Sequence, residues 1–140
     1  MAWMKEEGGV APSRILSRQT EYYAGLDLGK ARDFAALVVV EREESMYADF
    51  DPVSREWRKE TLYCVVHAER LPLGTPYLRV AEKVRERLTR NPLNGKATLV
   101  VDETGVGAPV VEVLRQESAW RDLVPVVITS GNVATRHGRS

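Results

Sequence analysis

Seven consecutive residues, Phe34–Val40, are apolar and mostly aliphatic. A run of this kind is typical of a strand that is buried on both faces of a sheet. The shorter β-prone run Tyr22–Asp27 precedes it, and a glycine-containing, charged turn separates the two. Because the turn has only about six residues, we expect the two strands to pair as an antiparallel hairpin.

The hairpin is expected to extend outward as a ribbon. Residues 42–60 are polar and carry charges of both signs, interrupted by Tyr47, Phe50 and Trp57. In their middle, Asp51–Ser54 contains Asp-Pro followed by small or polar residues, which indicates a turn. A third core strand is predicted at Thr61–His67.

The second half of the chain alternates between helical and strand patterns. Apolar residues at helical spacing predict a helix over Tyr77–Arg90. A fourth strand, Ala97–Val101, ends at Asp102, and a glycine-rich turn leads into a short helix that contains Val110 and Leu114. A fifth strand is predicted at Leu123–Ile128. The sequence therefore predicts an α/β fold with a mixed five-stranded sheet and the order β-β-β-α-β-α-β.

Composition limits the classes of protein to consider. With 140 residues, a mass of 15.7 kDa and 44% hydrophobic residues, the chain suits one globular domain. We expect a flexible leader at residues 1–20, a domain at 21–130 and a flexible tail at 131–140. Twenty basic and twenty acidic residues give no overall charge that would favour nucleic acid.

The setting is predicted to be cytosolic and reducing. The single cysteine, Cys64, has no partner for an internal disulfide and is expected to be a small buried hydrophobic residue. No apolar run has the roughly 20 residues of a membrane-spanning helix, and no signal peptide is evident. His67 lies within an apolar strand, where a packed or hydrogen-bonded histidine is favoured over a metal ligand.

Two aspartates end predicted strands, Asp27 after the first and Asp102 after the fourth. If these strands are adjacent and parallel, both carboxylates lie at the carboxyl edge of the sheet, where α/β proteins bind ligands. Converging carboxylates suit Mg²⁺ and phosphodiester hydrolysis. The alternative is that each aspartate only accepts hydrogen bonds within its turn.

Two segments resemble a known family. Gly25–Gly29 (Gly-Leu-Asp-Leu-Gly), with Arg32-Asp33 and the apolar run after it, forms the first, and Val100–Gly107 (Val-Val-Asp-Glu-Thr-Gly-Val-Gly) forms the second. Together they are similar to the ribonuclease-H-like nuclease domain of bacteriophage terminase large subunits and their prophage relatives, over roughly residues 22–135. The first motif also occurs in sugar kinases and actin-like ATPases.

The resemblance implies a nuclease that cleaves double-stranded DNA with Mg²⁺ or Mn²⁺ in a bacterial cytoplasm, with other phage packaging proteins as further partners. Asp27 would bridge two metal ions and Asp102 would hold one of them. Glu103, one residue along, and Asp33 are further candidate ligands.

Basic and glycine residues near these acids are candidates for DNA contact. Lys30 and Arg32 would neutralise phosphates, with ordinary surface charge as the alternative. Gly105 and Gly107 precede a helix whose backbone N–H groups could receive a phosphate. The glycines are also explained by a turn that needs their backbone freedom.

The chain departs from the family in two ways. These nucleases take a third acid from a helix after the fifth strand, but no Asp or Glu follows Asp122. We therefore expect a C-terminally truncated domain. The phosphate-binding loop of the packaging ATPase is also missing.

Two other functions remain open. One is a non-catalytic DNA-binding or assembly module with the same fold. The other is a fragment of an actin-like or sugar-kinase ATPase, for which Lys30-Ala31-Arg32 lacks the expected Thr or Ser.

Overall fold

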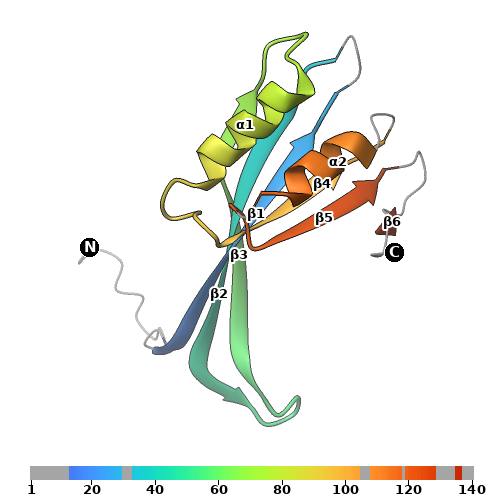
Figure 1. Cartoon of the computed structure of the whole chain (residues 1–140). Coiled ribbons are helices and arrows are strands. Elements are labelled where there is room, and N and C mark those ends of the chain that lie inside the picture. Colours follow the sequence, from blue (N-terminus) through green and yellow to red (C-terminus); the bar gives the residue numbers. More distant parts are fainter. Residues whose placement is uncertain (1–12, 30–32, 105–107, 118, 129–134, 137–140) are drawn as a thin grey trace. The chain divides into compact units, whose positions relative to one another are not determined.

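The computed structural model describes residues 13–29, 33–104, 108–117, 119–128 and 135–136 (Figure 1). Along the chain the elements are β1 (Ile15–Asp27), β2 (Ala36–Asp51), β3 (Glu56–Arg70), α1 (Tyr77–Leu88), β4 (Ala97–Asp102), α2 (Ala108–Arg115), β5 (Asp122–Val127) and β6 (Thr135–Arg136). The strands lie in the order β3-β2-β1-β4-β5-β6.

The predicted α/β class, mixed sheet and two helices are confirmed. β1, β4 and β5 are parallel neighbours, whereas β6 pairs with β5 in the antiparallel direction. The order of elements differs from the prediction because β6 follows β5. Two polar residues are too short a segment to show a periodic pattern, so this strand has no signal in the sequence.

The chain divides into two compact units, and each is described by itself. The ribbon unit contains the described residues 13–20 and 43–62, and the core unit contains residues 21–42 and the described residues from 63 onward. Residues 15–20, predicted to belong to a flexible leader, are instead part of β1. In the predicted tail, 131–140, the described residues are 135–136, which form β6.

The ribbon unit ends in a tight turn between β2 and β3, where the sequence predicts one. The Asp51 carboxylate accepts the N–H of Val53 at 2.8 Å, and the Asp51 carbonyl accepts the N–H of Arg55 at 2.8 Å. Phe50 and Trp57 flank the turn with their rings edge to face, 5.2 Å apart. Local hydrogen bonds and this aromatic pair therefore hold the turn.

The core unit buries one face of its sheet. Both helices lie on the same side of the strands (Figure 1). The α1 residues Val80, Val84 and Leu88 are buried, and so are alternate strand residues such as Leu26 and Leu99. This alternation is typical of a sheet covered on one face.

Two expectations about burial were wrong. Phe34 and Val38 in the long apolar run are 43% and 37% exposed, so the run is not buried on both faces. The predicted third core strand lies in β3, at the edge of the sheet, where Cys64 and its neighbours are exposed. An edge strand has a partner on one side alone, which leaves its side chains with less cover.

Candidate functional site

The two strand-end aspartates are neighbours. β1 and β4 are parallel and paired in register, with Leu26 opposite Val101 and Asp27 opposite Asp102. Adjacent strands lie about 4.8 Å apart, so the two aspartates are separated by one strand spacing. Because Leu26 and Val101 are buried, the aspartates that follow them lie on the other face, which we call the open face. The condition that the sequence left open for a shared site, adjacent and parallel strands, is therefore met.

Each aspartate also holds the turn that follows it. Asp27 Oδ1 accepts the N–H of Gly29 at 3.0 Å, and Asp102 Oδ1 accepts the N–H of Thr104 at 2.9 Å. The turn role proposed as an alternative is therefore present at both residues. It uses one oxygen of each carboxylate and fixes the orientation of the other.

The two turns are themselves restrained. Gly29 has a φ of +64°, and a Cβ at this position would lie 2.7 Å from the carbonyl oxygen of Asp33. Thr104 Oγ1 accepts the N–H of Ile128 at 3.0 Å. The turn after Asp27 is therefore restrained by a backbone conformation that only glycine accommodates. The turn after Asp102 is restrained by the hydrogen bond between Thr104 and Ile128, the residue that follows β5.

A shallow cavity of about 260 Å³ lies on the open face beside the pair. Its wall is largely aliphatic, and its polar side chains are the two aspartates. The residues that line it are Gly25, Leu26, Asp27, Ala36, Val38, Val100, Asp102, Val126 and Ile128. The site thus combines two carboxylates with an uncovered apolar surface.

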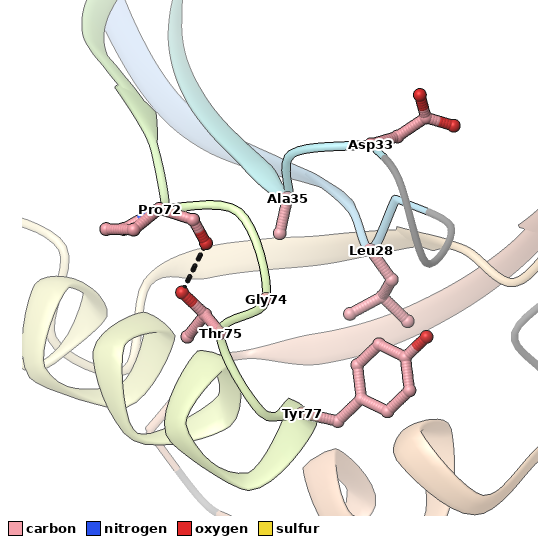
Figure 2. Close-up of a pocket in the computed structure, with 7 residues that line it drawn as sticks. All are labelled: Leu28, Asp33, Ala35, Pro72, Gly74, Thr75 and Tyr77. Atoms are coloured by element: carbon pink, nitrogen blue, oxygen red, sulfur yellow. Dashed lines mark hydrogen bonds between the residues drawn. The ribbon is translucent and has the colours of Figure 1, made fainter.

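The other predicted acids lie differently. Glu103 follows Asp102 directly, and its N–H donates to the carbonyl of Val126 at 2.9 Å, which continues the pairing of β4 with β5. Asp33 lines a separate cavity of about 100 Å³ together with Thr75 and Tyr77. In Figure 2 its carboxylate points away from that cavity. The structure therefore does not group Asp33 with Asp27 and Asp102.

The donor set suits a hard cation but is small. Carboxylate oxygens are the ligands that Mg²⁺ and Mn²⁺ prefer, and one or two carboxylates with waters and phosphates complete many Mg²⁺ sites. Among the described residues, no group of three or more His, Cys, Asp or Glu could hold a metal ion. Asp122 is paired with Thr98 at the other end of the sheet. The pair therefore fits one shared cation better than a full two-metal site.

The four predicted DNA contacts, Lys30, Arg32, Gly105 and Gly107, lie outside the described residues. His67 is hydrogen-bonded, as predicted, with its Nε2 3.1 Å from Glu69. In the part of the chain that the structure describes, no helix has the length and apolar character needed to cross a bilayer.

A second polar cluster, which contains Arg87 and Arg90, lies at the far end of the core unit and was not predicted from the sequence. These residues follow an apolar helical pattern and resemble ordinary basic residues at a helix end. No signal in the sequence connects them with β3.

Comparison with known proteins finds no matching family model and no significantly similar curated protein.

Proposed function

We propose that this chain is a metal-dependent DNA endonuclease-like domain, related to the nuclease domain of phage terminase large subunits. Its substrate would be double-stranded DNA in the cytoplasm of a bacterial host, and its cofactor Mg²⁺ or Mn²⁺. The observation that supports the proposal is the pairing of Asp27 with Asp102, in register, on the open face. Two carboxylates one strand spacing apart concentrate negative charge where a divalent cation would offset it.

The residues of the chain hold and orient the site. Gly29 and Thr104 each donate a backbone N–H to one aspartate, so each carboxylate keeps one orientation without rearrangement. A bound divalent cation supplies a polarised water and neutralises the phosphate. Among the described residues, Asp27 is exposed and Asp102 is half-buried, so a substrate can approach both carboxylates from the open face.

A second candidate is a non-catalytic DNA-binding or assembly module with the same architecture. Two observations favour it: both aspartates already accept hydrogen bonds within their turns, and the described residues contain no third acid grouped with them as a possible metal ligand. Such a module would retain DNA in the absence of metal, and retention would weaken with salt.

Plasmid nicking in Mn²⁺ separates the two candidates. The chain is compared with Asp27→Asn and Asp102→Asn, because asparagine keeps the acceptor for the turn and removes the charge. Asp122→Asn is the matched control, since this aspartate also bonds a backbone N–H but lies at the other end of the sheet. Melting of all four proteins is recorded with and without Mn²⁺.

The nuclease proposal expects nicking and a Mn²⁺-dependent rise in melting temperature, both lost in Asp27→Asn and Asp102→Asn and kept in Asp122→Asn. Absence of nicking together with a melting temperature that Mn²⁺ does not change would contradict it. Salt-sensitive retention of DNA in that case would support the binding module.

A further inference from the structure

A second cavity lies in the core unit at the end of the sheet opposite to Asp27 and Asp102. Its volume is about 370 Å³, within the range of small-molecule sites. It is bordered by Tyr22, which is paired with the first residue of β4, and by the segment that follows α1. Its lining residues are Tyr22, Glu41, Val66, His67, Arg87, Arg90, Asn91, Pro92 and Leu93.

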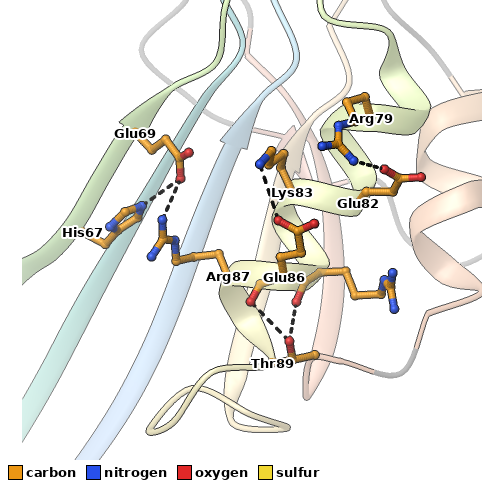
Figure 3. A network of polar contacts seen from close by, with 9 residues as sticks. His67, Glu69, Arg79, Glu82, Lys83, Glu86, Arg87 and Thr89 are labelled. Carbon is orange, nitrogen blue, oxygen red and sulfur yellow. Dashed lines mark hydrogen bonds and ion pairs between the residues drawn. The ribbon is translucent and has the colours of Figure 1, made fainter.

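One carboxylate fixes two of the basic groups at this cavity. Glu69 Oε2 lies 3.1 Å from His67 Nε2 and 3.4 Å from Arg87 Nη2, so it connects β3 with α1 (Figure 3). This arrangement resembles that of residues which orient a ligand-binding side chain from behind. Arg87 has further N–H donors beyond the one that faces Glu69.

The usual role of arginines at a helix end does not account for this cluster. Basic side chains there often offset the negative end of the helix. Here Thr89 Oγ1 lies 2.8 Å from the carbonyl oxygen of Arg85 and 3.2 Å from that of Glu86 (Figure 3). Because the Thr89 hydroxyl lies within hydrogen-bond distance of these carbonyls, the Arg87 side chain can extend to Glu69 of β3 instead.

Arg90 supplies a second guanidinium. Among the described residues, no hydrogen bond or ion pair is formed by its side chain, although it lines the cavity. Asn91 follows directly and also lines the cavity. The acidic residue in the lining is Glu41, and burial together with this neighbouring carboxylate raises the pKa of the Tyr22 hydroxyl. The lining therefore contains two guanidinium groups and one carboxylate, and Glu69 is a second carboxylate behind Arg87.

The remaining wall is apolar or aromatic. Leu93 is buried, and Pro92, Val66 and the Tyr22 ring complete this wall. Guanidinium groups bind phosphate oxygens through paired N–H donors, while an aromatic wall suits a flat ring. Both features occur within one cavity.

We propose that this cavity binds a phosphomonoester on an aromatic body, with Arg87 and Arg90 as the phosphate ligands. The phosphomonoester would be either a free small molecule or the 5′ phosphate of a nucleic-acid strand. The site is independent of the proposed nuclease, because no residue of the Asp27–Asp102 cavity lines it.

Binding of phenyl phosphate tests the proposal. Heteronuclear NMR chemical-shift changes locate the binding, and titration calorimetry measures its affinity. Arg90→Gln should weaken binding roughly tenfold, the effect of one charge-assisted hydrogen bond. Arg79→Gln is the matched control, since it removes the same charge from the first turn of α1, where Arg79 pairs with Glu82 at 2.6 Å. Glu41→Gln should tighten binding because it removes the negative charge from the cavity.

Two further binding comparisons distinguish a free phosphomonoester from the 5′ phosphate of a nucleic-acid strand. Phenyl phosphate and a mononucleotide represent the free molecule, and a 5′-phosphorylated oligonucleotide is compared with its unphosphorylated form. Tighter binding of the phosphorylated strand alone assigns the site to strand ends. Loss of affinity that is equal in Arg90→Gln and Arg79→Gln, or absence of phenyl phosphate shifts at residues 87–93, overturns the proposal. Asp27→Asn should bind phenyl phosphate as the unmodified chain does, whether or not the chain is a nuclease.

Discussion

Two segments of similar composition have opposite environments in this protein. Leu62–Val66 in β3 and Ala97–Val101 in β4 are both apolar and rich in β-branched residues. Leu99 and Val101 are fully buried, whereas Leu62 and Val65 are 65% and 63% exposed. Hydrophobicity therefore identifies both segments as strands but does not determine which of them enters the core.

Position in the sheet explains the difference. β4 lies between β1 and β5, so it has a hydrogen-bonded partner on each side. β3 lies at the edge of the described sheet, next to β2. Pairing with β1 also brings Asp102 beside Asp27, so the same position that buries β4 creates the candidate site.

The largest expected effect comes from truncation of one leucine in each strand. Leu99→Ala should cost about 2–5 kcal/mol of unfolding free energy, because it leaves a cavity in the core. Leu62→Ala should change that free energy by less than about 0.5 kcal/mol, because its side chain is already in water. Urea unfolding of both variants measures the two costs. Similar costs would mean that β3 is buried in solution.

A smaller effect is expected where Glu69 of β3 contacts Arg87 of α1. The hydrogen bond from His67, assisted by Arg87, lowers the pKa of Glu69 against the opposing effect of burial. A lowered pKa in the folded state stabilises the fold above the unfolded value, about 4.3 for glutamate, and the contribution is lost as pH falls through the folded value. Glu69→Gln should therefore cost up to about 1 kcal/mol at pH 7 and less as the pH falls below 4.

Unfolding of Glu69→Gln at both pH values checks this expectation. Glu86→Gln is the control, because it removes an exposed ion pair with Lys83 on the same helix. A cost for Glu69→Gln that does not change with pH would contradict the assignment of its effect to the charged carboxylate.

The smallest effect on stability is expected at Cys64. Its thiol is exposed in β3, so Cys64→Ser should change the free energy of unfolding by less than about 0.5 kcal/mol. The native protein should nevertheless react with a thiol reagent without denaturant. A Leu99→Cys variant in the Cys64→Ser background should react only on unfolding. Protection of Cys64 in the native protein would show that β3 is covered in solution.

Prediction from the sequence was correct where pattern and structure share a local cause. Asp-Pro within a polar stretch predicts the turn after Asp51, and apolar runs followed by aspartate predict that Asp27 and Asp102 end strands. It failed where the cause is tertiary. Residues 15–20 are exposed along β1 and show no apolar pattern, so they resembled a leader. The exposure of β3 depends on its place in the strand order, and the cluster around Glu69 depends on the contact between Glu69 of β3 and Arg87 of α1. Neither is encoded locally.

Gly29, two residues after Asp27, affects the candidate site through the space that its backbone occupies. Gly29 donates its N–H to Asp27, has a positive φ, and has the backbone of Asp33 and Phe34 within 3 Å of where a Cβ would lie. Any side chain at position 29 would therefore displace the loop and the carboxylate that it orients. In a saturation mutagenesis screen for the function of this site, position 29 should tolerate as few substitutions as position 27, although glycine has no functional group to contribute.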